Sequence, residues 1–480
     1  MVFASGIFIF TFLPITVIGN YILRDKSVCI KNAFLLLMSM YFYLESGIGQ
    51  FLLLLTSILV NYCMALAISH AHSRESNCCK KLWLVLAIIY NVATLFIFKY
   101  LSFVFGDLSI LFGGVLPEKV VAVTLPLGIS FYTFQALSYV IDVYKDSNLV
   151  EKKLINVALY ISFFPQLVAG PIVRWNSIHA DLTRKNRGGY WNEGLERFTI
   201  GLAKKVIIAN HMAVFADKAF ALLDEGNLTI GFAWIGAVAY SLQIYFDFSG
   251  YSDMAIGLGR LFGFTFPDNF NYPYLSKSIS EFWRRWHISL SRWFRDYVYI
   301  PLGGNRCSRE RMILNLLVVW TLTGIWHGAN YTFWLWGLLY FVFLMIEKML
   351  KRQQMKNTVL DWFRHIYTML IVIILWVIFR ADSLEKAWLY ILHMFGKATL
   401  SNSIYANGVT CLYFKNFIGY GIIAIIGCFP WYQRLKKFMC SHFEKKTVSA
   451  IFQIWIVLIF ALSCCVTVDS NYNPFIYFNF

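Results

Sequence analysis

Long apolar runs separated by short basic segments make up most of this chain. Each run approaches the roughly 20 residues that an α-helix needs to cross a bilayer, so the pattern predicts about twelve membrane-spanning helices. The predicted spans are residues 7–23, 82–105, 120–143, 206–223, 232–248, 313–329, 332–346, 366–379, 417–429 and 450–466, with two more in the hairpin 33–68. The expected fold class is an all-α polytopic membrane protein.

Basic residues set the predicted orientation of these spans. Arg24, Lys26 and Lys31 follow the first run. Because Lys and Arg favour cytoplasmic loops, both ends of the chain are predicted outside. No polar stretch is long enough to fold separately, which predicts one integrated domain, residues 1–480. The first run lacks a basic leading segment and a small-residue cleavage site, so we expect a retained span and not a signal peptide.

Residues 154–173 depart from this regular pattern. They end in FFPQLVAGPIVR, and basic residues flank both sides. Pro165, Gly170 and Pro171 disfavour a continuous helix, and broken backbone at membrane depth must be buried in protein or line a cavity. A re-entrant segment is the favoured interpretation, and a kinked ordinary helix is the alternative.

Composition agrees with a membrane protein. Of 480 residues, 59% are hydrophobic and only 14% are charged. The net charge of +16 is explained first by orientation in the membrane and second by attraction to anionic lipid or an anionic substrate, and we expect no nucleic-acid partner. The ten cysteines form no paired CxxC motifs, so neither a disulfide framework nor a metal site is expected.

Residues 281–304, EFWRRWHISLSRWFRDYVYIPLGG, form the most unusual polar stretch. At 100° per residue they predict one amphipathic helix with an aromatic face and a cationic face. An interfacial anchor would explain this pattern, but it would not explain His287 on the apolar face. The aromatic face comprises Trp283, Trp286, His287, Leu290, Trp293, Phe294 and Tyr297.

Seven arginines fall within the 28 residues 284–311. Guanidinium groups bind phosphate in a bidentate manner, so this density suits a polyphosphate or carboxylate ligand. Positive-inside topology alone could also produce it. The residues that we predict to bind such a ligand are Arg284, Arg285, Arg295 and Arg306.

His327 lies in the segment TLTGIWHG, within the mostly apolar residues 314–350. An ionisable side chain at membrane depth is costly, which makes it a candidate functional residue. A helix-packing histidine with one hydrogen bond is the alternative.

Several motifs resemble the alginate O-acetylation branch of the membrane-bound O-acyltransferase superfamily. They are MVFASGIFIFTFLPI, SFFPQLVAGPIVR, QIYFDFSGYSDMAIGLG, FWRRWHISLSRWFRDYVYIPLGGNR, TGIWHGANYTFWLWG and NPFIYFNF, in the order expected. The resemblance implies a helical fold around a central tunnel, with interfacial and re-entrant helices. It makes His327 and His287 the catalytic candidates, with His327 as the base or first acyl acceptor and His287 assisting.

The same resemblance implies a reaction. Acetyl-CoA would be the cytoplasmic co-substrate, with no bound cofactor, and a cell-envelope polysaccharide would be the acceptor. An extracytoplasmic serine-type O-acetyltransferase would be the partner, and the chain would lie in the plasma or inner membrane. D-alanyl transfer to teichoic acid from a carrier-protein thioester is the alternative reaction, and a transporter without covalent chemistry is the alternative class.

The closing PFIYFNF places Tyr477 after the last predicted span. Aromatic residues there are usually an interfacial belt. Tails of this kind in the resembling family suggest a transient acyl carrier, which makes Tyr477 a candidate relay. Asp247 and Asp253, in YFDFSGYSD, could orient a histidine or a hydroxyl, or cap helices.

Overall fold

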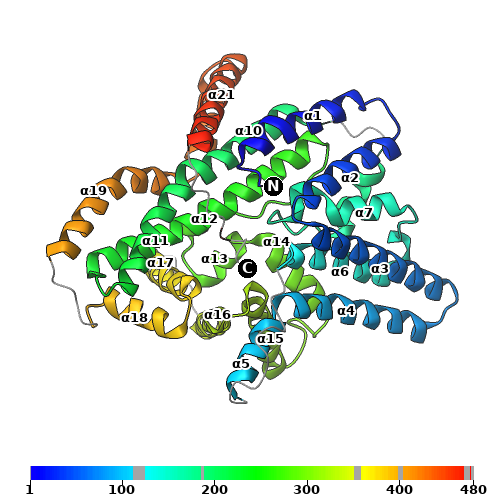
Figure 1. Ribbon diagram of the computed structural model, residues 1–480, viewed down its shortest axis with the longest axis horizontal. Coiled ribbons are helices and arrows are strands. Elements are labelled where there is room, and N and C mark those ends of the chain that lie inside the picture. The colour runs from blue at the N-terminus through cyan, green and yellow to red at the C-terminus, as the bar shows by residue number, and fades with distance from the viewer. Residues whose placement is uncertain are drawn as a thin grey trace. The chain divides into compact units, whose positions relative to one another are not determined.

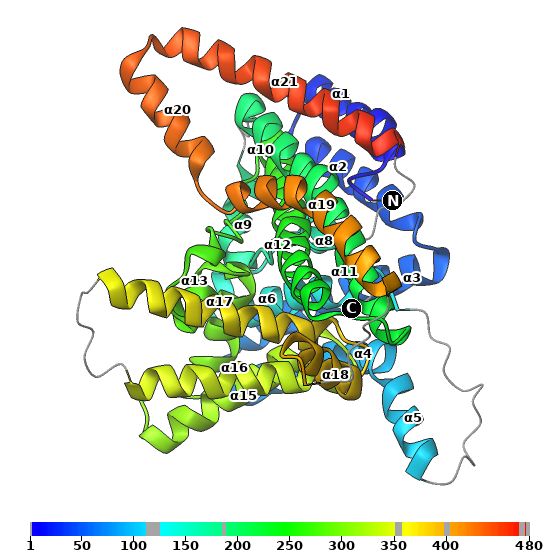
Figure 2. The same ribbon diagram turned by 90° about the vertical axis from the view of Figure 1, so that its left-hand side faces the viewer.

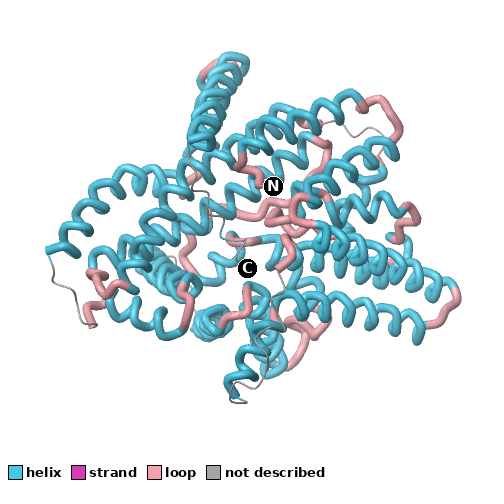
Figure 3. Tube along the Cα trace, viewed as in Figure 1, coloured by secondary structure: helices cyan, strands magenta, loops and turns pink. Residues whose placement is uncertain are grey.

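In a computed structural model, residues 2–111, 125–184, 189–350, 358–397, 404–469 and 476 are described. The elements in these ranges are helices joined by loops, with no β-strand among them (Figure 1; Figure 3). The chain divides into two compact units, Met1–Phe198 with Met254–Pro267, and Thr199–Asp253 with Asp268–Phe480. Two of the three boundaries between the units fall within helices, α10 (Trp191–Ala203) and α12 (Ile230–Leu261), and the third lies in the loop after α12, between Pro267 and Asp268. The single domain predicted from the sequence stays a prediction.

Seven helices in the described ranges are long and apolar enough to cross a membrane. This finding confirms a polytopic membrane protein, whereas the count of twelve spans and the tunnel stay predictions. Two further apolar helices, Phe8–Ile22 and Val28–Leu44, are shorter. The seven are Ile48–Ser73, Asn77–Lys99, Trp191–Asp224, Tyr331–Leu350, Val359–Arg380, Asn407–Gly427 and Lys445–Asp469.

The first unit contains the predicted hairpin as helices α2 (Val28–Leu44) and α3 (Ile48–Ser73). Helix α4 (Asn77–Lys99) packs on α3, and a buried amide pair joins the two. Asn61 Nδ2 donates to Asn91 Oδ1 at 3.3 Å, and Asn91 Nδ2 donates to Asn61 Oδ1 at 2.7 Å. Amide pairs of this kind hold helices together where no water competes for the hydrogen bonds. The unit also contains α1 (Leu13–Ile22), α5 (Leu101–Leu111), α6 (Ile129–Lys145) and α9 (Trp175–Thr183).

The segment 154–173 is broken, as its proline and glycine residues indicate. Helix α7 (Leu154–Ser162) ends before Phe163, and the four-residue helix α8 (Phe164–Leu167) follows. The freed backbone is satisfied internally: the Tyr160 hydroxyl donates to the Val173 carbonyl at 2.9 Å, and Gln166 Nε2 donates to the Tyr160 carbonyl at 2.5 Å. Its re-entrant placement in the membrane stays a prediction.

In the second unit, helices α15 (Arg309–His327) and α16 (Tyr331–Leu350) form the tight pair that the sequence predicts. Their backbones meet at two glycines: a Cβ on Gly324 would lie 2.5 Å from the Phe333 carbonyl oxygen, and one on Gly337 would lie 2.6 Å from that of Trp320. Helix α17 (Thr358–Arg380) packs on α16, and Figure 2 shows α15, α16 and α17 side by side. The remaining long elements are α11 (Asn210–Asp224), α18 (Leu384–Met394), α19 (Ile404–Gly427), α20 (Trp431–His442) and α21 (Lys445–Asp469).

The prediction of one continuous amphipathic helix over 281–304 is wrong. Helix α13 (Ile279–Arg285) ends before Trp286, helix α14 (Ile288–Phe294) begins after His287, and the π-helix η6 (Arg295–Tyr299) follows. The division into faces nevertheless holds, because the aromatic residues are buried and the neighbouring Arg284, Arg292 and Arg295 are exposed. The break changes where His287 points, and with that its chemistry.

Candidate active site

His287 occupies the break between α13 and α14. Its φ of 42° and ψ of 53° lie in the left-handed region, which costs a non-glycine residue roughly 1–2 kcal/mol. Two backbone bonds hold the break open: the Asn271 amide donates to the Arg285 carbonyl at 2.9 Å, and the Ile288 amide donates to the Asn269 carbonyl at 2.9 Å. Strain of this kind is typical of functional positions.

Asn269 determines which nitrogen of His287 carries the proton. Its Oδ1 accepts from the Ser289 backbone amide at 3.2 Å and the Ser289 hydroxyl at 2.9 Å, and its Nδ2 donates to Ser252 Oγ at 3.0 Å. A backbone amide can only donate, so the atom that faces Ser289 is the oxygen. His287 Nδ1 lies 3.1 Å from the same oxygen. Nδ1 must therefore be the protonated nitrogen, which leaves the lone pair on Nε2.

The Nε2 atom of His287 is available to accept a proton. It is buried and makes no hydrogen bond to the described residues. Burial lowers the pKa of His287 to about 3, so the ring is neutral at physiological pH and Nε2 carries no proton. A buried imidazole with one nitrogen oriented and the other open has the arrangement that a general base requires.

His327 ends helix α15 and is 4% exposed. Its ring packs edge-on against Trp336 and Phe379, with both centroid distances at 5.1 Å. The Gly324–Gly337 contact lies one turn before it and fixes the distance between α15 and α16. The predicted burial of His327 among apolar side chains is confirmed.

Trp326 brings the two histidines into one site. The centroid of its indole lies 5.0 Å from that of His327 and 6.0 Å from that of His287. The two residues come from different segments, the end of α15 and the break before α14. The structure therefore places both predicted histidines around the same aromatic ring.

Buried polar hydrogens lie on the rings that extend from His327 through Trp336. The indole N–H groups of Trp283 and Trp336 and the hydroxyl of Tyr340 are buried and have no hydrogen-bond partner among the described residues. The ring of Trp336 contacts three of its neighbours. Its centroid lies 5.6 Å from that of Trp283, 5.7 Å from that of Trp376 and 5.0 Å from that of Tyr340. Such donors can stabilise a carbonyl oxygen that gains negative charge.

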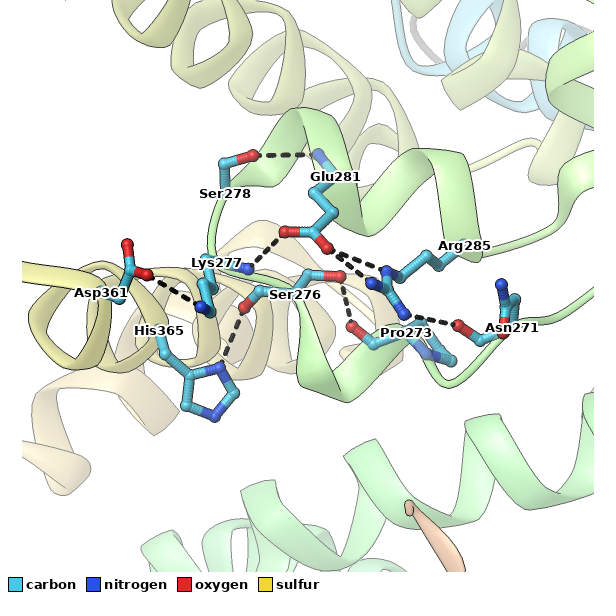
Figure 4. Close-up of polar contacts among 9 residues, drawn as sticks. All are labelled: Asn271, Pro273, Ser276, Lys277, Ser278, Glu281, Arg285, Asp361 and His365. Carbon is cyan, nitrogen blue, oxygen red and sulfur yellow. Dashed lines mark hydrogen bonds and ion pairs between the residues drawn. The ribbon is translucent and has the colours of Figure 1, made fainter. Parts of the chain in front are cut away.

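The four predicted ligand-binding arginines differ in their surroundings. Arg285 is held within the protein (Figure 4), because its Nε and Nη2 donate to Glu281 Oε1 at 3.0 and 2.7 Å and its Nη1 donates to the Asn271 carbonyl at 3.3 Å. Burial opposes ionisation of Glu281, but the Lys277 amide and the Arg285 guanidinium outweigh it and lower the pKa of Glu281. Arg285 thus fastens α13 to the loop before it.

The other three arginines are exposed. Arg295 pairs with the adjacent Asp296 at 2.6 Å. The side chains of Arg284 and Arg306 make no ion pair with any described residue. Among the four, Arg284 and Arg306 are the ones whose guanidinium groups are available to an added anion.

Two further results concern residues that sequence reasoning missed or could not place. Asn269 carries no motif signal, since it is a polar residue in the loop PDNFNYPY, and only its burial and its three partners reveal its role. Tyr477 lies outside the described residues. The residue before it, Ile476, is described and buried.

The chain is similar to known O-acetylating proteins along most of its length. It is 38% identical to the "probable alginate O-acetylase" of Azotobacter vinelandii over 100% of both chains. It is 44% identical to the protein of the same name from Pseudomonas aeruginosa over 81% of this chain and 74% of that one, and 34% identical to the peptidoglycan O-acetyltransferase of Helicobacter pylori over 100% and 98%. The pattern of the membrane-bound O-acyltransferase family matches residues 35–384. This chain belongs to the membrane-bound O-acyltransferase family and is an O-acyltransferase.

Proposed function

We propose that this enzyme takes an acetyl group from cytoplasmic acetyl-CoA and passes it across the membrane for O-acetylation of a cell-envelope polysaccharide. The names of its full-length relatives support acetyl transfer to an envelope polymer. The observation that carries the chemistry is the pair of buried histidines around Trp326, one of which presents an oriented, unprotonated Nε2.

The proposed reaction is acyl transfer from a thioester. A hydroxyl oxygen attacks the acetyl carbonyl carbon while an imidazole nitrogen takes the hydroxyl proton. The tetrahedral intermediate collapses, the C–S bond breaks, and the coenzyme leaves as a thiolate that recovers the proton from the imidazolium. His327 is the base that faces the acceptor hydroxyl, and His287 assists through Nε2. The buried indole N–H groups beside His327 stabilise the oxyanion.

The arginines around α13 and α14 bind the donor. Acetyl-CoA carries phosphate groups, which guanidinium recognises well. Arg284 and Arg306 meet these phosphates directly because neither forms an ion pair with a carboxylate of the described residues. Arg295 contributes through the field of its exposed charge, and Arg285 keeps α13 in place.

The acetyl group then leaves through a relay. The attacking hydroxyl in this reaction is the phenol of Tyr477, so the first product is an acyl-tyrosine. The serine hydroxyl of an extracytoplasmic O-acetyltransferase then attacks the acyl-tyrosine carbonyl, the phenol leaves, and the serine ester passes the acetyl group to a polysaccharide hydroxyl. A phenol, with its pKa of about 10, is a better leaving group than an alkyl alcohol, so transfer of the acetyl group from the tyrosine to the serine hydroxyl runs downhill. This route requires a tunnel across the inner membrane, within about twelve spans.

Inside-out membrane vesicles that contain the enzyme test this function. Acetyl-CoA labelled in its acetyl group should transfer label to the C-terminal peptide when the downstream transferase is absent, and to polymer when it is present. Vesicles with His327→Ala should transfer at least about 10²-fold less, the usual scale for a general base. Label from a D-alanyl carrier-protein thioester in place of acetyl-CoA would favour the alternative reaction. Movement of acetyl-CoA without any covalent transfer would favour a transporter.

A further inference from the structure

A buried ion pair joins Lys205 and Asp247 in the second unit. The Lys205 Nζ and Asp247 Oδ1 atoms are 2.8 Å apart, and the two side chains are 2% and 1% exposed. Desolvation of two charges offsets much of their attraction, so such a pair contributes little net stability and its presence points to another role.

The local helix geometry brings this lysine to its acid. Lys205 lies in η4 (Lys204–Ala209), a π-helical turn inside the continuous helix from α10 to α11. Helix α12 approaches closely, because a Cβ on Gly250 would lie 2.7 Å from the Gly201 carbonyl oxygen. π-helical turns of this kind occur frequently at functional sites. A second pair, Lys204 with Asp253 at 2.6 Å, lies beside the first but is more exposed, at 23% and 9%.

The second carboxylate oxygen of Asp247 holds the segment that follows the last span. Asp247 Oδ2 accepts from the Ile476 backbone amide at 3.0 Å, between residues 229 positions apart in sequence. Ile476 is 9% exposed. Helix α21 ends at Asp469 and contacts η4, the π-helical turn that contains Lys205.

We propose that Lys205 and Asp247 are positioning residues that dock the C-terminal segment of the enzyme. Lys205 occupies one carboxylate oxygen of Asp247, which directs the other toward the Ile476 amide. A hydrogen bond from a backbone amide to a carboxylate is charge-assisted and independent of side-chain identity, so it fixes the register of the segment. Ile476 immediately precedes Tyr477, so the dock restricts where that phenol can reach. This last step rests on the relay in the proposed function, whereas the docking does not.

Paired substitutions separate the loss of the acceptor oxygen at position 247 from the loss of the ion-pair charges. Lys205→Met with Asp247→Asn removes both charges and keeps an oxygen that can accept from Ile476. Lys205→Met with Asp247→Ala removes the acceptor as well. Lys204→Met with Asp253→Asn is the matched control, because it removes the neighbouring ion pair between the same two helices.

Hydrogen exchange at the Ile476 amide, measured by mass spectrometry on the full-length enzyme in nanodiscs, reports docking directly. We expect slow exchange in the unmodified enzyme and in the Lys204 control. Exchange should rise less than about 10-fold with Asp247→Asn and at least about 100-fold with Asp247→Ala, since only the latter loses the hydrogen bond. Fast exchange in the unmodified enzyme, or equally slow exchange with Asp247→Ala, would overturn the dock.

Kinetics test what docking does for the reaction. The Asp247→Ala pair should lower kcat for polymer acetylation at least about 10-fold and leave the KM for acetyl-CoA unchanged, because the donor site is untouched. Ile476→Pro, which removes the amide donor without altering the ion pair, should lower kcat likewise, whereas Ile476→Val should not. These two variants keep the test open if the Asp247→Ala pair fails to fold. Full kcat in the Ile476→Pro enzyme would overturn the positioning role.

Tyr477→Phe tests the relay separately from the docking. If this variant acetylates polymer normally while exchange at the Ile476 amide stays slow, the relay is contradicted and the docking is not.

Discussion

Asn269 Oδ1 accepts a hydrogen bond from His287 Nδ1 at 3.1 Å, and this one contact gives the histidine a defined tautomer. The same oxygen also faces the Ser289 amide and hydroxyl, so it cannot rotate away without breaking all three contacts. The geometry makes Nε2 the proton-accepting atom of His287. An oriented proton acceptor is suited to direct proton transfer as well as to an assisting role.

Asn269→Ala should therefore impair catalysis without removing a histidine. The imidazole would be free to adopt the other tautomer and to swing, so we expect kcat to fall by roughly 10- to 100-fold, less than the roughly 10²- to 10⁴-fold that acid–base catalysis itself contributes, because the base is misoriented and not removed. Asn269→Asp keeps an acceptor for Nδ1 and should retain more activity. The rate of label transfer from acetyl-CoA measures both variants. Equal activity in Asn269→Ala and the unmodified enzyme would mean that the tautomer of His287 has no part in the reaction.

The two histidines can be ranked by single substitution. His327→Ala should lower acyl transfer by at least about 10²-fold, while the protein still inserts. His287→Asn, chosen because asparagine tolerates the left-handed backbone, should be the less severe change. Single-turnover rates with acetyl-CoA provide the comparison. If His287→Asn abolishes transfer and His327→Ala does not, the two roles are reversed.

Sequence pattern predicts those parts of this fold that depend on local composition. The hairpin 33–68 and the pair α15 and α16 follow from apolar length, and the burial of His327 follows from its apolar neighbours. The break at His287 does not, because residues 281–294 contain neither glycine nor proline and keep helical periodicity. That break is held by Asn269, 18 positions earlier. The partner of Ile476 lies 229 positions away, beyond the reach of any local pattern.

The exposed arginines should act on donor binding. Arg284→Gln with Arg306→Gln should raise the KM for acetyl-CoA roughly 10-fold with less change in kcat, since phosphate contacts are equal in the ground and transition states. Arg285→Gln is the control, because it breaks the ion pair with Glu281. This variant should have a lower unfolding temperature and a KM for acetyl-CoA that changes little. An unchanged KM in the Arg284 and Arg306 variant, with poorer membrane insertion, would favour the lipid-anchor interpretation.

Acid should destabilise the enzyme partly through His287. Its folded pKa is about 3, while an unfolded histidine titrates near 6.5. Between these values the unfolded chain binds a proton that the folded protein does not, so stability falls as the pH drops below about 6.5. The contribution is at most about 1.4 kcal/mol per pH unit for one proton. Unfolding temperatures from pH 4.5 to 7 should therefore depend less on pH in His287→Asn. The exposed His442→Asn is the control, and parallel curves for His287→Asn and the unmodified enzyme would contradict the assignment.

Gly324→Ala should separate helices α15 and α16 next to the active site. The added Cβ would lie 2.5 Å from the Phe333 carbonyl oxygen, and backbone cannot yield as a flexible side chain can. We expect a loss of about 1–3 kcal/mol in the free energy of unfolding. Acyl transfer should fall too, because His327 lies one turn farther along α15. Gly419→Ala in α19 is the matched control: its Cβ would meet nothing within 4 Å, and alanine is the better helix former, so that variant should be neutral or slightly stabilised. Thermal unfolding in detergent and label transfer measure both. Similar unfolding temperatures for the two variants would show that α15 and α16 tolerate a wider spacing and that the Gly324 contact does not hold His327 in place.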